Sequence, residues 1–147
     1  MGGSSYSGPP IRAKIPISME LTACALFDGI PDKELKKIQA EMTEIKHPAG
    51  KEIMVRGDDG VGFMVILAGE AEVRLPNRTA RLKVGDHFGE MALLDHQGRS
   101  ASIVAVTPLT VSAVASWEFE SFLAEHPKVA YHMLQSMSRR LRDADNR

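Results

Sequence analysis

The sequence predicts an α+β fold: an antiparallel, jelly-roll-like β-roll with short N-terminal helices and two C-terminal helices. Two observations lead to this prediction. Between Met42 and Ala115 the hydrophobic residues recur with a period of two, in short runs separated by turns that contain glycine. On both sides of this segment they recur at spacings of three and four, which is typical of helices. Short strands at near-regular spacing favour a roll or jelly roll.

The composition is that of one globular domain. The chain has 147 residues and a net charge of −1, so it can bury a real core and carries no overall field that favours nucleic acid or acidic membranes. Cys24 is the one cysteine, which excludes an internal disulfide and fits a cytoplasmic, reducing compartment. The hydrophobic runs are shorter than the ~18 residues of a membrane helix. We therefore expect neither a nucleic-acid nor a membrane partner for this chain.

The first residues differ from the rest of the chain. Residues 1–16 are rich in Gly, Ser and Pro, a composition that buries little surface. We expect this segment to be a flexible tail or a cloning remnant, and residues 17–147 to form one domain. Residues 18–29 predict a short helix with Leu21, Ala25 and Leu26 along one face.

A second helix is predicted to begin at Pro31-Asp32, with apolar residues at spacings of three and four. Leu35, Ile38 and Met42 form its apolar face. Its charged residues are expected to face water, and these are Lys33, Glu34, Lys36 and Lys37.

Seven strands are predicted after the second helix. They cover residues 43–47, 52–55, 62–67, 70–75, 79–83, 100–106 and 109–115. The turns between them are marked by Gly50, Gly57, Gly69 and Gly85.

Two helices are predicted at the C-terminal end. Ser116 is a candidate N-cap for a helix that contains Trp117, Phe119, Phe122 and Leu123. Pro127 ends that helix and occupies the first turn of the next one.

The last helix carries apolar residues at spacings of four, three, four and three. They are Ala130, Leu134, Met137, Leu141 and Ala144. This heptad pattern is compatible with a homodimer through the last helix, or with packing of the helix on its own roll. Basic residues Arg139, Arg140 and Arg142 alternate there with Asp143 and Asp145, which favours a solvated helix face.

The segment from Phe88 to Val104 contains most of the candidate ligand-binding residues. Gly89 permits a positive φ or a close approach to a ligand. Glu90 to Leu94 can form one helical turn, whose N-terminal N–H groups suit an anion. Arg99 offers a planar cation that matches a phosphate, and Ser100 adds a hydroxyl donor. A carboxylate beside a phosphate needs another partner, so Glu90 is expected to accept a hydrogen bond from a sugar hydroxyl. The segment therefore predicts a binding site for a phosphorylated ribose.

The letters F-G-E-M-A-L-L, four further residues, and R-S-A-S-I-V resemble the phosphate-binding cassette of the cyclic nucleotide-binding domain family. The sequence L-F-x-x-I-P at Leu26 also resembles the helical entry of that family. One departure is Gly98, where many members have proline. The resemblance implies a set of cassette residues that contact the ligand, namely Gly89, Glu90, Met91, Ala92, Arg99, Ser100 and Ala101.

The resemblance also implies contacts to the base. It places Val73 opposite the base. Leu82 and Ile103 are further candidates because they are apolar and face inward, but for these two a plain core position is the favoured interpretation. It puts the adenine cap in the last helix, where Arg142 could stack on the base and Asp145 could accept a hydrogen bond from the adenine amino group. Arg139-Arg140-Leu141 resembles the start of the dimerising helix in bacterial members of the family.

The leading hypothesis is a non-enzymatic receptor that binds a cyclic purine nucleotide and relays binding by movement of the C-terminal helices. The ligand favoured is cAMP, with cGMP as the alternative, and no cofactor or metal is expected. A second hypothesis is a cassette that has lost its ligand and serves only in assembly. A third is a metal-dependent enzyme of cupin type, which would need clustered histidines. The five histidines form no H-x-H motif, which argues against it.

Overall fold

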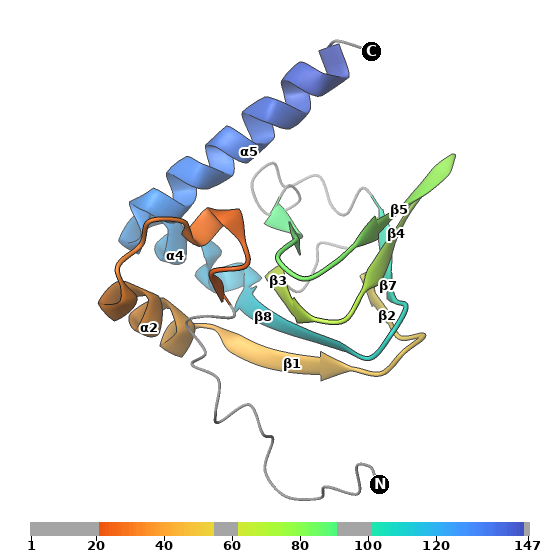
Figure 1. The fold of residues 1–147 in the computed structure, drawn as a ribbon, viewed down its shortest axis with the longest axis horizontal. Helices are drawn as coiled ribbons and strands as arrows, with labels where there is room; N and C mark the ends of the chain where they lie inside the picture. Colours follow the sequence, from red (N-terminus) through yellow and green to blue (C-terminus); the bar gives the residue numbers. More distant parts are fainter. Residues whose placement is uncertain (1–20, 55–61, 91–100, 146–147) are drawn as a thin grey trace, which may run out of the picture.

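Two antiparallel sheets form the body of the protein. In the computed structural model, which describes residues 21–54, 62–90 and 101–145, the first sheet has the strand order β1-β8-β3-β6 and the second has the order β2-β7-β4-β5. The strands are β1 (Thr43–His47), β2 (Glu52–Met54), β3 (Gly62–Ala68), β4 (Ala71–Leu75), β5 (Arg78–Leu82), β6 (His87–Phe88), β7 (Ser102–Ala105) and β8 (Leu109–Ala115). The sheets curve around a common interior (Figure 1). The predicted β-roll is confirmed.

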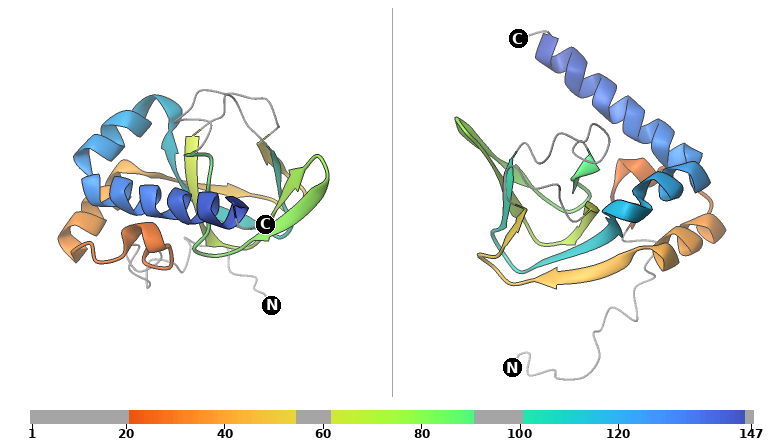
Figure 2. Two further views of the ribbon diagram at one scale, coloured as in Figure 1. Left: turned by 90° about the horizontal axis from the view of Figure 1, so that it is seen from above. Right: turned by 180° about the vertical axis from the view of Figure 1, so that it is seen from behind.

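The helices gather beside this roll. They are the 3₁₀ turns η2 (Ala25–Phe27) and η3 (Ser116–Glu118) and the helices α2 (Asp32–Glu41), α4 (Phe119–Glu125) and α5 (Pro127–Asp145). The right view in Figure 2 shows α5 leaving the helical cluster and extending beyond the roll, and the left view, from above, shows it crossing over the roll. No helix within the described ranges is long and apolar enough to cross a membrane.

Strand β3 separates two hydrophobic clusters. Its residues from Gly62 to Leu67 are all buried, and successive side chains point to opposite faces of a sheet. Phe63, Val65 and Leu67 belong to the cluster that the helices cover, together with Leu35, Ile38, Phe119 and Met133 among others. Met64 and Ile66 belong to the cluster between the sheets, together with Phe88, Ile103 and Val111 among others. One face of β3 therefore packs against the helices, and its other face packs into the interior between the sheets.

Helix α5 packs on its own domain through one stripe. Val129 and Met133 are buried, and Met137 packs against the same cluster; this spacing of four places all three on one helix face. In contrast, Leu134 and Leu141 are 64% and 65% exposed. Of the predicted heptad residues, Met137 thus packs on the domain, whereas Leu134 and Leu141 are exposed; the buried Val129 and Met133 belong to a stripe that the sequence analysis did not predict.

Two predictions about helices need correction. The predicted helix over 18–29 does not run to residue 29: Leu21, the first described residue, is helical, but Cys24 is extended with φ −97° and ψ 127°, and a 3₁₀ turn of three residues follows. Leu21, Cys24, Leu26 and Phe27 are all buried, which is more than one helical stripe could bury. Ser116 does not cap α4, because it begins a 3₁₀ turn and α4 starts at Phe119 without a side-chain cap. The start of α5 at Pro127 is confirmed.

The turns agree with the sequence. Gly50, Gly69 and Gly85 have φ values of 87°, 91° and 94°, which favour glycine. At Gly69 a Cβ atom would also collide with the backbone oxygen of Pro108. The strand ends lie within two residues of the predicted ones in the described ranges, whereas β6, with only two residues, was missed. Residues 1–16 and Gly57 lie outside the described residues.

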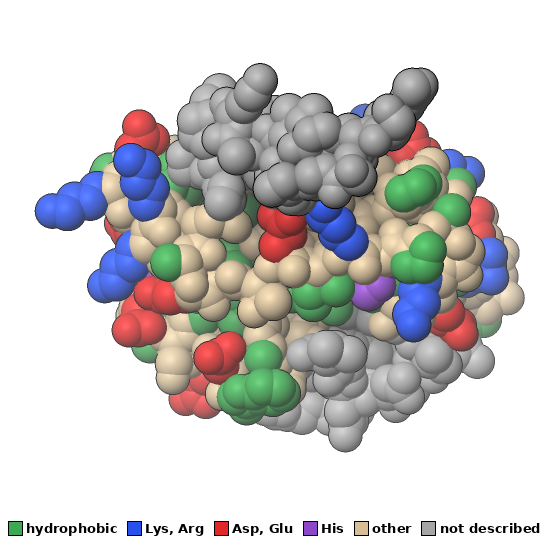
Figure 3. Space-filling view, turned by 90° about the horizontal axis from the view of Figure 1, so that it is seen from below, with side chains coloured by type: hydrophobic (Ala, Val, Ile, Leu, Met, Phe, Trp, Pro, Cys, Tyr) green, Lys and Arg blue, Asp and Glu red, His purple; other side chains and the backbone are tan. Residues whose placement is uncertain are grey.

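Charged side chains of both signs are scattered over the face shown in Figure 3. Among the described residues on that face, neither sign forms a continuous patch. This distribution agrees with the net charge of −1 and gives this face no one-sign field that would attract a polyanion.

Candidate ligand site

The short strand β6 brings the cassette to the edge of the first sheet. His87 and Phe88 pair with Val65 and Met64 of β3, and Phe88 is buried between the sheets. Gly89 follows with φ 99°, so the chain turns there in a conformation that side chains rarely adopt. This confirms one reason given for a glycine at the position. Glu90 is helical, and residues 91–100 lie outside the described residues.

Glu90 is a buried carboxylate, with 2% of its surface exposed. Its Oε1 lies 3.1 Å from Nδ1 of His87, and its Oε2 accepts a hydrogen bond of 3.3 Å from Nη1 of Arg140. Burial alone would raise the pKa of Glu90, but the hydrogen bond and charge of His87, the backbone and the charge of Arg140 more than offset it. The pKa of Glu90 is therefore lowered. The carboxylate is held ionised and keeps lone pairs for a further donor.

Arg140 connects the last helix to this carboxylate. It lies on α5, 50 residues after Glu90, and its side chain is 49% exposed. The sequence favoured a solvated face for this residue, because the neighbouring aspartates suggested simple alternation of charge. Arg140 is exposed as predicted, and the structure adds a contact with Glu90 that the sequence did not predict. One sequence feature pointed to this helix, namely the resemblance of Arg139-Arg140-Leu141 to the family, but it did not indicate that Arg140 contacts Glu90.

The predicted base-contacting residues lie on neighbouring strands. Val73 on β4 pairs with Ile103 on β7 and with Ala80 on β5. Val73 and Leu82 are partly buried against the cluster between the sheets, and Ile103 is a buried member of it. The three residues therefore border the same apolar interior, which suits a flat base as well as a plain core.

The remaining predicted residues divide into two groups. Ala101 is half-buried just before β7, and Arg142 and Asp145 are exposed on the last turns of α5. Four cassette residues lie outside the described residues, namely Met91, Ala92, Arg99 and Ser100. The phosphate contacts assigned to Arg99 and Ser100 stay predictions.

Comparisons with known proteins agree with this geometry. The family model described as "Cyclic nucleotide-binding domain" matches residues 44–126. The Cyclic AMP receptor protein of Thermus thermophilus is 34% identical over 128 residues, which are 82% of this chain and 58% of that protein. The cAMP-dependent protein kinase regulatory subunit of Aspergillus niger is 37% identical over 101 residues, which are 67% of this chain and 25% of that protein.

A solved structure shares the fold. The crystal structure of the Thermus thermophilus Catabolite Activator Protein superposes with a TM-score of 0.76 at 33% identity, over 82% of this chain and 59% of that one. The β-roll, with Glu90 of the cassette at its edge, agrees with these matches. The chain belongs to the cyclic nucleotide-binding domain family. It spans between about a quarter and three fifths of the length of the two curated relatives named above.

Proposed function

We propose that this chain binds a cyclic purine nucleotide, cAMP in preference to cGMP, and acts as a sensor rather than as an enzyme. The observation that carries the proposal is the buried, ionised Glu90 directly after Gly89, with both carboxylate oxygens already held by protein donors. A buried carboxylate at the entrance of an apolar roll suits a neutral hydroxyl donor. The 2′-hydroxyl of a ribose is such a donor.

The other contacts follow from the cassette. Arg99 and the N–H groups after Gly89 bind the cyclic phosphate, with Met91, Ala92, Ser100 and Ala101 completing the cradle. Val73 lies against the base. A desolvated phosphate paired with a guanidinium supplies both affinity and orientation.

The output is assigned to α5. Arg140 joins this helix to Glu90, so a ligand that binds Glu90 also changes the surroundings of an α5 residue. Because a guanidinium has five donors, Arg140 can keep Glu90 and still donate to a ligand beside it. Binding then stabilises the conformation in which the end of α5 covers the base, with Arg142 and Asp145 as the capping residues. The ligand shifts this equilibrium only by its differential affinity for the two conformations.

Self-association through α5 is the second part of the output. Leu134, Leu141 and Tyr131 are 64%, 65% and 60% exposed on this helix, and isolated soluble domains seldom expose an apolar stripe without a partner. A second copy that packs on these residues would form a homodimer. The same helix would then carry both the ligand contact and the dimer contact.

Direct calorimetric titration of the purified chain with cAMP and with cGMP tests the proposal. We expect saturable binding of one nucleotide per chain, with cAMP the tighter ligand. Absence of saturable binding for both nucleotides would contradict the proposal and favour the ligand-free assembly module.

A further inference from the structure

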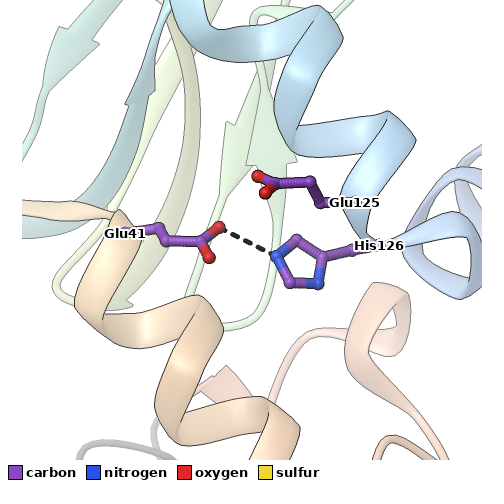
Figure 4. A group of neighbouring side chains, drawn as sticks. All are labelled: Glu41, Glu125 and His126. Carbon is purple, nitrogen blue, oxygen red and sulfur yellow. Dashed lines mark hydrogen bonds and ion pairs between the residues drawn. The ribbon is translucent and has the colours of Figure 1, made fainter.

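A buried histidine outside the roll is surrounded by carboxylates. His126 follows α4 and is 2% exposed. Its Nδ1 lies 3.2 Å from Oε2 of Glu34, and its Nε2 lies 2.8 Å from Oε1 of Glu41. A third glutamate, Glu125, brings a carboxylate oxygen to within 4.8 Å of the ligand atoms of Glu41 and His126. Figure 4 shows Glu41, Glu125 and His126 pointing toward one another from α2 and from the end of α4.

The local structure fixes this arrangement. Glu34 and Glu41 are seven residues apart on α2, which is about two helical turns and places them on one face. The backbone N–H of His126 donates to the carbonyl of Phe122 at 3.0 Å, and the ring of Phe122 lies 5.1 Å from the imidazole. The imidazole is therefore held in one orientation by packing as well as by its polar partners.

The charges around His126 are unbalanced. Three carboxylates surround one imidazole, and in the described ranges no lysine or arginine forms an ion pair with Glu34, Glu41 or Glu125. The sequence predicted that Glu34 faces water, whereas its side chain is only 38% exposed and contacts His126. A neutral imidazole has one N–H donor and one nitrogen lone pair. With a carboxylate at each nitrogen, the lone pair and its carboxylate neighbours can bind a cation.

A surface cavity lies beside the same residues. It has a volume of about 240 Å³ and is lined by Glu41, Glu125, Glu118, Ser121 and Trp117 among others. Glu41 and Glu125 thus border solvent-accessible space while Nε2 of His126 lies behind them. An ion held by the three groups would have a coordination position open to water on the cavity side.

We propose that Nε2 of His126 and the carboxylates of Glu41 and Glu125 form a binding site for a divalent transition-metal ion. Glu34 accepts the Nδ1–H of the imidazole, which is the usual outer-shell partner of a metal-binding histidine and directs the Nε2 lone pair toward the ion. One nitrogen and two carboxylates, without a thiolate, suit Zn²⁺, with water as the fourth ligand from the cavity. The imidazole nitrogen disfavours Mg²⁺ and Ca²⁺.

The site is separate from the nucleotide site and from the cupin-type site considered above. It lies among the helices, and it joins α2 to the residue that immediately precedes α5. An ion there would stabilise the position from which α5 leaves the domain. Metal binding and nucleotide binding involve different residues, so a result that disproves one proposal does not disprove the other.

Titration of the chelator-treated full chain with Zn²⁺ and with Co²⁺ tests the proposal. We expect one Zn²⁺ per chain, visible absorption bands of low-symmetry Co²⁺, and a rise in unfolding temperature with Zn²⁺ concentration. Glu125→Gln should weaken Zn²⁺ binding at least tenfold, His126→Gln should abolish the Co²⁺ bands, and Glu34→Gln should weaken binding by a factor of about 10–100 through loss of the outer-shell partner.

Glu118→Gln is the matched control, because Glu118 lines the same cavity but is not one of the three ligands. It should retain the Zn²⁺ affinity of the wild type. Should His126→Gln fail to fold, the exposed Glu125 still provides the comparison. The proposal is overturned if the wild type has no saturable site, if Glu125→Gln binds Zn²⁺ as well as the wild type, or if Glu118→Gln loses as much affinity as Glu125→Gln. Any of these results would leave His126 with the hydrogen bonds to Glu34 and Glu41 as its assigned role.

Discussion

Nη1 of Arg140 lies 3.3 Å from Oε2 of Glu90, although the two residues are 50 positions apart in the chain. One belongs to the last helix and the other to the cassette at the edge of the first sheet. This hydrogen bond connects the proposed ligand site to helix α5, whose movement is the proposed response to ligand.

Glu90 is proposed to accept a hydrogen bond from the ribose 2′-hydroxyl. The ligand 2′-deoxy-cAMP should therefore bind the wild type more weakly than cAMP by about 1.5–3 kcal/mol, the usual contribution of a hydrogen bond to a charged group. In Glu90→Gln the difference in binding free energy between cAMP and 2′-deoxy-cAMP should be smaller. Calorimetry with both ligands on both proteins measures it, and equal affinity of the two ligands for the wild type would exclude the assigned role.

The lowered pKa of Glu90 makes the free energy of unfolding depend on pH. Burial raises the pKa of Glu90, but the groups that donate to its carboxylate lower the pKa by more, so the folded-state value lies below the ordinary value of 4.5. The contribution to the free energy of unfolding is therefore present above pH 4.5 and is lost as the pH falls through the folded-state pKa.

Urea unfolding from neutral pH to below the ordinary pKa of Glu90 tests this. Glu90→Gln should remove part of the acid-induced loss of stability, whereas Glu120→Gln, at an exposed position of α4, should leave it unchanged. A pH dependence in Glu90→Gln identical to that of the wild type would contradict the assignment.

The end of α5 is proposed to cover the base when ligand binds. Amide hydrogen exchange beyond Arg139 should slow in the presence of cAMP, and truncation after Ser138 should weaken cAMP binding. Arg140→Ala should reduce both effects because it removes the contact with Glu90, while Arg139→Ala serves as the neighbouring control. Unchanged protection, together with full affinity in the truncated chain, would show that α5 is no lid.

Selectivity between purines is expected to be modest. Asp145 could accept a hydrogen bond from the adenine amino group, whereas Ser100 is a hydroxyl that guanine-selective members of the family also use. We expect cAMP to bind more tightly than cGMP by about tenfold or less, which corresponds to about 1.4 kcal/mol. Competition of cGMP against bound cAMP measures the ratio. A clear preference for cGMP would reverse the assignment of the ligand.

Local patterns predicted most of the strands and the start of α5. They succeeded where one signal dominates, such as Pro127 at a helix start or Gly85 in a turn. They failed over residues 22–29, where Cys24, Leu26 and Phe27 are buried in the cluster under the helices at spacings that do not follow one helical stripe. They also missed β6, because two residues are too short to show alternation.

The site was predicted less completely than the fold. Gly89 and Glu90 became candidates because they are part of one continuous sequence motif. The pairing of Glu90 with Arg140, and of Glu34 with His126, joins residues that are 50 and 92 positions apart. Such pairs depend on tertiary packing and leave no periodic signal in the sequence. Arg140 and Glu34 were both expected to face water, and each keeps part of its side chain exposed while it contacts a residue distant in the sequence.

The most direct test of the central claim compares the wild type and Arg99→Leu in calorimetric titrations with cAMP. Arg99 is assigned to the phosphate, so its loss leaves a desolvated charge without a partner and should cost about 2–5 kcal/mol of binding. Arg81→Leu, which removes an exposed arginine paired with Glu70, should bind like the wild type. Saturable cAMP binding by the wild type that is weakened in Arg99→Leu alone is the predicted result, and normal cAMP binding by Arg99→Leu would contradict the account.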